Sequence, residues 1–347
     1  MNKRSSKQSR SRFEWQLLTD EELLDVRLCD LELTIDGTPL ENRVQRLYRE
    51  LEARNIPFKP HTWVGEEWFT PDRVTGFAIP FYLTHPRLIR LERNQMLEVE
   101  GGADKECMRI LRHETGHAID NAYRFHKRQR YRVLFGSFAR PYPDSYKPQP
   151  DSRNFVLHLG AWYAQAHPAE DFAETFAVWL RHRSVWRRRY KNWPALRKLE
   201  YIDRLMNEMA APPPEVKARI EVEPLSELKF TLREHYRRKR EHYIFKWPAD
   251  FDRDLHRIFS DSSQNATRPT ATSFLRRFRR ELRHEVAEVT GVHHYTIDQV
   301  LKLIIDRSKE LKLRVGITES NAKEKMLVLL TAHTMNVVHS GYHRIAL

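Results

Sequence analysis

The chain contains only two cysteines and no long apolar run, and both shortages restrict what it can be. Cys29 and Cys107 are too few for a disulfide framework or for a zinc site built from thiolates. The longest aliphatic stretches, such as residues 326–330, are far shorter than the roughly 18 residues that span a membrane. The basic N-terminal segment is not followed by the apolar core of a secretory signal. We therefore expect a protein of the reducing cytoplasm that has no membrane partner.

Basic residues exceed acidic residues, and the excess is unevenly distributed. The formal net charge is +13, from 60 Lys and Arg against 47 Asp and Glu. Residues 1–12 carry five basic and no acidic side chains, residues 13–224 are balanced, and residues 225–347 carry 23 basic against 15 acidic side chains. This distribution suits nucleic acid or another polyanion as a partner of the C-terminal region, but it does not indicate a fold.

Composition and periodicity divide the chain into four parts. Residues 1–12, rich in Ser and Arg, are expected to form a disordered tail. Residues 13–210 predict one domain, the proline-rich residues 211–224 a linker, and residues 225–347 a basic helical domain. The predicted fold class is α+β, with a small sheet and helices in the first domain and a mostly α-helical C-terminal domain.

The predicted sheet and two predicted helices lie close together in the first domain. Short β-rich runs at 61–64, 76–79 and 88–91 predict the strands. One helix is expected from an N-cap at Asp104 to about residue 125. Another helix opens at His167, which is followed by proline at the first helical position. These two helices carry the residues that point to chemistry.

The first of these helices contains the motif H-E-x-x-H, at His113, Glu114 and His117. Residues four apart lie on one face of a helix, so the two imidazoles can bind one zinc ion. Glu114 would then lie beside the open coordination position, where a general base is needed. Because such a short motif also arises by chance, it requires a third ligand.

The second helix offers carboxylates for that third position. In one known arrangement a histidine follows His117 by six residues, but a tyrosine stands there in this chain. Glu170 and Glu174 lie one helical turn apart and hence on one face. One carboxylate can bind zinc while the other orients a ligand imidazole through its distal N–H. His158 and His167 are the nearest alternative ligands.

The two motifs together resemble a known family. HETGH followed about fifty residues later by E-D-F-A-E-T-F-A resembles the zinc-binding metallopeptidases of gluzincin type, and the layout is similar to the catalytic domain of anthrax lethal factor. The resemblance covers about residues 60–185 and implies a zincin-like domain. It implies that Glu170 is the third zinc ligand and Glu174 the partner of His113. Tyr163 stands where the lethal-factor type places a tyrosine that stabilises the oxyanion.

The activity implied by the resemblance is zinc-dependent hydrolysis of peptide bonds, with one Zn²⁺ per chain. Glu114 would act as the general base that takes a proton from water and passes it to the leaving amine. A peptide or protein substrate would bind in an extended form along a strand edge, for which residues 76–79 are the first candidate.

The basic C-terminal region supports a different hypothesis. Clusters of basic residues at 237–240 and 276–280, the first of them interleaved with aromatic residues, suit contacts with phosphate and stacking on bases. The alternative function is therefore a nucleic-acid-binding protein with a structural or inactive peptidase-like domain, or a protease that acts on nucleic-acid-bound proteins. Solvated helix faces would explain the same clusters.

Overall fold

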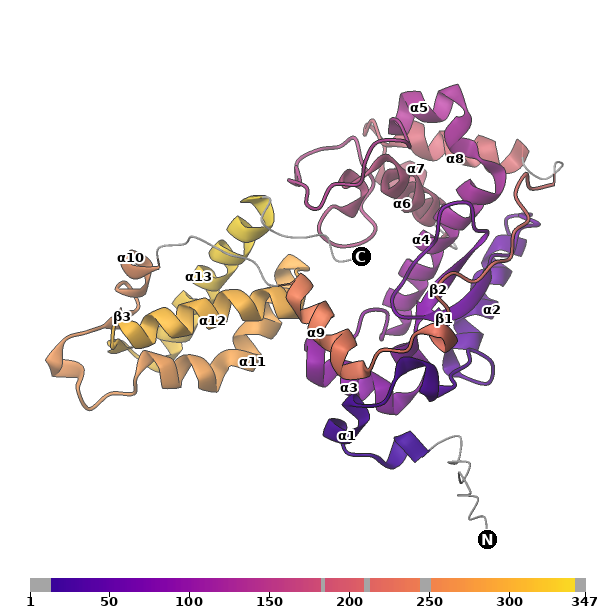
Figure 1. Ribbon diagram of the computed structural model, residues 1–347. Coiled ribbons are helices and arrows are strands. Elements are labelled where there is room, and N and C mark those ends of the chain that lie inside the picture. The colour runs from indigo at the N-terminus through magenta and orange to yellow at the C-terminus, as the bar shows by residue number, and fades with distance from the viewer. Residues whose placement is uncertain (1–13, 182–184, 209–212, 244–250, 341–347) are drawn as a thin grey trace, which may run out of the picture.

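The computed structural model describes residues 14–181, 185–208, 213–243 and 251–340 (Figure 1). Within these ranges the protein is mostly helical with small sheets, which is the α+β class that the sequence predicts. No helix in these ranges is long and apolar enough to cross a membrane. The predicted basic tail, 1–12, lies outside the described residues.

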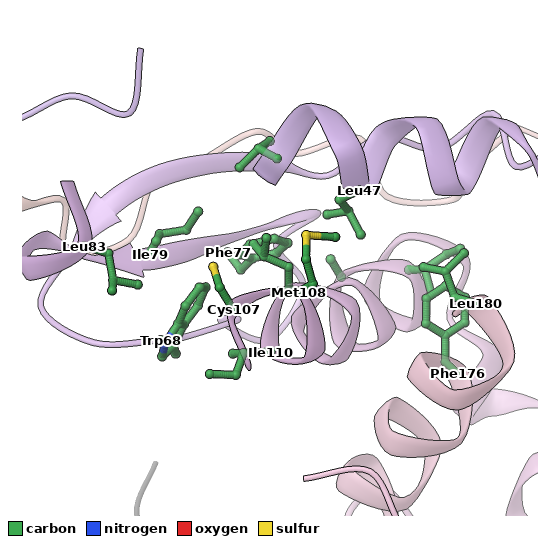
Figure 2. Close-up of a cluster of buried hydrophobic side chains, with 14 of the residues drawn as sticks. Leu47, Trp68, Phe77, Ile79, Leu83, Cys107, Met108, Ile110, Phe176 and Leu180 are labelled. Atoms are coloured by element: carbon green, nitrogen blue, oxygen red, sulfur yellow. The ribbon is translucent and has the colours of Figure 1, made fainter. Parts of the chain in front are cut away.

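The first part of the chain surrounds a two-stranded sheet. Its helices are α1 (Asp20–Leu24), α2 (Pro39–Glu52), α3 (Pro86–Met96), α4 (Asp104–Tyr123), α5 (Gln129–Phe135), α6 (Pro168–Leu180), α7 (Trp186–Arg189), α8 (Leu196–Glu208) and α9 (Leu232–His242). Strands β1 (His61–Gly65) and β2 (Gly76–Pro80) pair in parallel, with His61 opposite Gly76. The sheet contributes buried side chains to the core below α2 and above α4 (Figure 2).

The third predicted strand is wrong, because residues 88–91 lie in helix α3. His85 caps this helix by accepting a hydrogen bond from the backbone N–H of Arg87, and Pro86 occupies the first helical position. Leu88 and Leu91 are both fully buried, three residues apart, as one face of a helix requires. The local start signal therefore outweighed the β propensity of this apolar run.

The edge of β2 that was predicted to receive a peptide is partly occupied. The backbone N–H of Ala78 donates to the carbonyl oxygen of Phe69 at 2.8 Å, which forms an antiparallel bridge. Just before the strand, the backbone N–H and the hydroxyl of Thr75 both donate to the carbonyl oxygen of Ala218. Within residues 76–79 one backbone donor, the N–H of Ala78, is thus already used by the chain itself, whereas binding of a peptide along this strand stays a prediction.

Helices α4 and α6 pack closely and form the centre of the first part of the chain. Helix α4 has Ala103 at its N-cap instead of the expected Asp104, which lies in the first turn. Helix α6 begins as predicted, since His167 caps it by accepting from the backbone N–H of Ala169. All residues of α6 are buried, so this helix lies inside the protein and not on its surface.

The hydrophobic core of this part joins the sheet to the helices. Figure 2 shows Leu47 of α2, Phe77 of β2, Met108 of α4 and Phe176 of α6 in this cluster. Each of these side chains is at most 1% exposed. Burial of each contributes about 1.5–3 kcal/mol to folding, so the core holds the sheet against both helices that carry the motifs.

The C-terminal helices build a second hydrophobic core. They are α10 (Asp252–Leu255), α11 (Ala271–Thr290), α12 (His294–Glu310) and α13 (Glu319–Ser340), with a short antiparallel pair of strands, β3 (Phe259–Ser260) and β4 (Arg314–Val315). Figure 1 shows these helices on one side of the molecule, apart from α1–α8.

The two cores do not divide at the predicted linker, 211–224. Leu225, Leu232 and Tyr236 are buried in the first core, whereas the second core begins at Phe251. Lys239 of α9 also holds this helix against the first part of the chain, because its ammonium group donates hydrogen bonds to the carboxylates of Glu67 and Glu92. Apolar burial therefore places residues 225–243 with the first core, while the predicted domain boundaries stay a prediction.

The C-terminal helices meet the first part of the chain near α3. The backbone N–H of His294 donates to Oε2 of Glu98 at 2.8 Å. The His293 ring stacks on Tyr243 with ring centres 4.6 Å apart. Burial raises the pKa of the Glu98 carboxyl group to about 7, so this contact contains a group that titrates near neutrality.

Candidate metal centre

Two packed helices bring three potential metal ligands together. His113 and His117 lie one turn apart on α4, and Glu170 lies in the first turn of α6. The helices approach each other at Gly116, where an added Cβ would lie 2.7 Å from the Cα of Ala173. Glycine in HETGH therefore has a packing role, because any side chain there would push α6 and its carboxylate away from the histidines.

The ligand atoms of these three residues converge on one point. Oε2 of Glu170 lies 3.0 Å from Nε2 of His113 and 3.2 Å from Nε2 of His117, and the two imidazole nitrogens are 3.1 Å apart. Ligands at about 2.05 Å from a tetrahedral zinc ion are separated by roughly 3.3 Å. Two imidazole nitrogens and one carboxylate oxygen at these separations fit one Zn²⁺, so the structure brings together the predicted His-His-Glu set.

Electrostatics keep the carboxylate of this set ionised. Burial alone would favour the neutral acid, but the charge of His117 and hydrogen bonds from both imidazoles hold the pKa of Glu170 well below its usual range. Burial likewise opposes a charge on His113, yet its hydrogen bonds to Glu170 and Glu174 raise the pKa of this imidazole well above the ordinary value. A metal ion would therefore compete with a proton for His113.

Glu174 lies where the resemblance implies. Its Oε1 is 2.9 Å from Nδ1 of His113, the nitrogen that faces away from the other ligands. Its Oε2 accepts a hydrogen bond from the backbone N–H of Leu159 at 2.8 Å. With both oxygens engaged, the buried carboxylate fixes the orientation and the tautomer of the His113 ring.

Glu114 faces the cavity beside the cluster and is held by a residue that the sequence analysis missed. The hydroxyl group of Thr70 donates to Oε2 of Glu114 at 2.6 Å. Thr70 lies between β1 and β2, 44 residues before Glu114. No local pattern marks this threonine, because its role depends on the packing of the sheet segment against α4.

Two tyrosines lie at the centre, of which the sequence analysis identified one. The ring centre of Tyr163 lies 5.6 Å from that of His113, and the residue lines the cavity. Burial raises the pKa of Tyr163 well above its ordinary value, so the phenol stays protonated. Tyr142 was missed because its segment shows only the composition of a loop, yet its hydroxyl donates to Oε1 of Glu170 at 2.9 Å.

The alternative ligands are directed elsewhere. Nε2 of His158 lies 3.0 Å from the carbonyl oxygen of Arg109, and Nε2 of His167 lies 2.7 Å from that of Arg140. Cys107 is buried in the hydrophobic core, where burial raises the pKa of its thiol to about 11. None of these three residues joins the cluster of ligand atoms in the described structure.

A cavity of about 540 Å³ opens onto the cluster. His113, His117, Glu114, Glu170 and Tyr163 line one side of it, and residues 65–70 line another. A volume of this size is in the usual range for ligand pockets and accommodates several residues of a peptide. The segment after β1, and not β2 itself, therefore provides most of the sheet side of the cavity.

These features define a candidate His-His-Glu metal centre carried by two packed helices. Residues 93–190 match the family described as "Putative zinc-binding metallo-peptidase". The match includes all three ligands and Glu174 but covers less than a third of the chain. The resemblance to zinc-binding metallopeptidases stated from the motifs is confirmed for this segment. No curated protein and no solved structure matches the chain.

The basic clusters of the sequence are engaged largely in ion pairs and hydrogen bonds within the protein. These contacts join Arg237 to Glu241, Arg238 to Glu234, Lys239 to Glu67 and Glu92, Arg240 to Gln95, Arg277 to Glu319, and both Arg279 and Arg283 to Asp298. The aromatic residues 245 and 247 of the first cluster lie outside the described residues. Several of these pairs, such as Arg237 with Glu241 and Arg277 with Glu319, are about half exposed, and binding of nucleic acid by these clusters stays a prediction.

Proposed function

We propose that this protein is a zinc metallopeptidase of gluzincin type, a hydrolase with a His₂Glu metal site and Glu114 as its general base. The observation that carries the proposal is the convergence of the ligand atoms of His113, His117 and Glu170 beside a cavity that Glu114 also lines. A matching family of zinc-binding metallopeptidases supports it. A zincin-like domain is part of the proposal, since the motif helix α4 packs below a small sheet.

The metal-binding residues would be His113, His117 and Glu170, with one Zn²⁺ per chain. When bound, zinc supplies Lewis acidity that polarises a carbonyl group and acidifies a water molecule. The hydrogen bond from Tyr142 to Oε1 of Glu170 directs the other oxygen, Oε2, toward the imidazoles. Glu174 holds the His113 ring in place during the reaction.

Glu114 would perform the proton transfers. Thr70 donates to its Oε2 and thereby leaves Oε1 to accept a proton from the attacking water. The same carboxyl group then gives this proton to the amine of the leaving group. A side chain held by one strong hydrogen bond at the wall of the cavity is positioned for both steps.

Tyr163 is the proposed donor to the oxyanion. Its buried phenol keeps its proton, and its ring lies beside His113 on the wall of the cavity. A preorganised hydroxyl group in a site with little water stabilises developing negative charge strongly. Tyr142 is less suited to this task because its hydroxyl already donates to Glu170.

The first test is the zinc content of the purified protein, measured by elemental mass spectrometry. We expect one zinc per chain in the wild type and a loss of zinc in Glu170→Ala, whereas Glu200→Ala on the exposed face of α8 serves as a matched control. Glu114→Gln should keep the zinc and lose peptide hydrolysis, since only the base is removed. Absence of zinc from the wild type after incubation with the metal would refute the proposed centre.

A further inference from the structure

The cavity is acidic although the protein as a whole is strongly basic. Among the residues that the structure describes, no lysine or arginine lines it, but seven acidic residues do: Glu66, Glu67, Asp72, Glu114, Asp120, Glu170 and Glu223. The formal net charge of the chain is +13, so an acidic wall does not follow from its composition. A cavity of one charge sign concentrates ligands of the opposite sign.

Four of these seven carboxylates either belong to the proposed reaction or are bound by other groups of the protein. Glu114 and Glu170 belong to the proposed chemistry. Asp120 accepts hydrogen bonds from the backbone N–H and the Nδ1 of His126, at 2.9 and 3.0 Å. Glu67 is paired with the ammonium group of Lys239. The remaining three, Glu66, Asp72 and Glu223, are available to a ligand.

Glu223 is held at the cavity by a constrained backbone. Its φ angle of 49° lies in the left-handed region, which is unfavourable for a residue with a side chain. The preceding residue anchors this conformation, because Trp63 Nε1 donates to the carbonyl oxygen of Val222 at 3.2 Å. Val222 also packs against the small apolar cluster of Trp63 and Ala78. The exposed carboxylate is thus presented by packed elements although it lies on a connecting segment.

The other two carboxylates remain partly exposed beside their partners. Asp72 pairs with its neighbour Arg73 at 3.6 Å, but both side chains are mostly exposed, so this ion pair contributes little. Oε1 of Glu66 lies 2.8 Å from Nδ1 of the buried His235, but a third of the Glu66 side chain, 33%, remains exposed and can meet a ligand in the cavity. Both acids remain able to attract a cation.

Aromatic side chains complete the lining. Phe69 and Tyr142 are about half exposed, at 45% and 52%, and Trp68 and Phe138 lie on the same cavity. Apolar rings suit the methylene stem of a lysine or arginine side chain, and their faces attract its cationic head. An aromatic wall with carboxylates therefore matches a long cationic side chain better than an aliphatic or an acidic one.

We propose that the cavity selects peptide substrates with a lysine or arginine close to the scissile bond, and that Glu66, Asp72 and Glu223 determine this preference. This inference rests on the proposed peptidase function and names its substrate class. The selectivity is electrostatic, so it should be smaller at high ionic strength.

Binding without turnover tests the preference. Zinc-loaded Glu114→Gln protein is titrated into fluorescein-labelled peptides of alanine and serine that carry one central lysine, acetyl-lysine or glutamate, and anisotropy is recorded. We expect the lysine peptide to bind roughly tenfold more tightly than the acetyl-lysine peptide at low salt, and the glutamate peptide to bind most weakly. Equal affinities for the lysine and acetyl-lysine peptides, or no binding of the lysine peptide, would overturn the proposal.

Charge-neutral variants assign the preference to residues. Three substitutions are each added to the Glu114→Gln background: Glu66→Gln, Asp72→Asn and Glu223→Gln. Each should reduce the ratio of the affinities for the lysine and acetyl-lysine peptides about two- to fivefold. Glu200→Gln, which removes an exposed acid outside the cavity, should leave the ratio unchanged. A ratio that persists in the triple variant would refute the assignment.

The two proposals can fail separately. Hydrolysis of peptides by the wild-type zinc protein without any preference for lysine would leave the peptidase function intact and refute the acidic selection. Selective binding of lysine peptides without hydrolysis by the wild type would refute the peptidase function and keep the acidic selection.

Discussion

Gly116 offers a direct test of the packing that assembles the metal centre. In Gly116→Ala the added Cβ would lie 2.7 Å from the Cα of Ala173 and 3.0 Å from its carbonyl oxygen. Carbon atoms in contact are normally 3.5–4.0 Å apart, so α4 and α6 must separate by roughly 1 Å. Both close atoms belong to the backbone, and no side-chain rotation can relieve the contact.

The expected effect on stability is a balance of two opposing terms. Alanine in place of glycine within a helix stabilises it by about 1 kcal/mol. Overpacking of a tight interface costs about 1–3 kcal/mol. We therefore expect the free energy of unfolding of Gly116→Ala to decrease by up to about 2 kcal/mol, measured by urea denaturation of the metal-free protein.

Zinc affinity should respond more strongly than stability. Glu170 precedes Ala173 by one turn of α6, so separation of the helices carries its carboxylate away from the imidazoles. Metal–ligand distances tolerate deviations of only about 0.2 Å, and we expect zinc binding to weaken roughly 10- to 100-fold in a chelator competition assay. Adding Ala173→Gly to the Gly116→Ala variant should restore little of the zinc affinity, because it removes only the 3.1 Å contact with the Cβ of Ala173. Wild-type zinc affinity with a gain of about 1 kcal/mol in stability would refute this reasoning.

Three further predictions test other contacts. Glu174→Ala removes the partner of His113 Nδ1 and should weaken zinc binding roughly 10- to 100-fold in the same assay, whereas an unchanged affinity would contradict its role. Thr70→Val removes the hydrogen bond to Glu114 and should lower kcat about tenfold at unchanged zinc content; an unchanged kcat would mean that Thr70 does not position the base. Burial raises the pKa of Glu98 from 4.5 to about 7, so the folded state favours the protonated form of this carboxyl group. The free energy of unfolding is therefore highest below pH 4.5 and decreases as the pH rises through 7. The expected decrease in the wild type is about 3 kcal/mol, from the difference between urea denaturation at pH 5 and at pH 8, and Glu98→Gln should abolish it. If the variant shows the same pH dependence as the wild type, Glu98 is not the group responsible.

Local signals in the sequence account for much of the secondary structure. Thr19 and Glu22 form the capping box that their spacing predicts, with reciprocal hydrogen bonds at the start of α1. Gly291 ends α11 in the left-handed conformation, and the sequence predicts a helix at residues 320–339, close to the observed α13 at Glu319–Ser340. These features were predictable because caps and helix ends depend on residues only a few positions apart.

Ambiguous local signals failed where packing decided between alternatives. Residues 88–91 have the composition of a strand, but they bury leucines on one face of a helix. The proline-rich residues near 212 resemble a boundary, yet the chain returns to the first core at Leu225 and stays there through α9. Apolar burial over long sequence separations outweighed both local preferences.

By itself, the sequence determined which helices carry the candidate metal ligands and which faces present them. The four-residue spacings of His113 and His117 and of Glu170 and Glu174 place each pair on one side of its helix, whatever surrounds it. Only the tertiary structure decided that Thr70 reaches Glu114, that Tyr142 reaches Glu170, and that the cavity wall is acidic. These contacts join residues 28 to 44 positions apart, and they exist only because packed helices and a small sheet fix distances that the covalent chain leaves open.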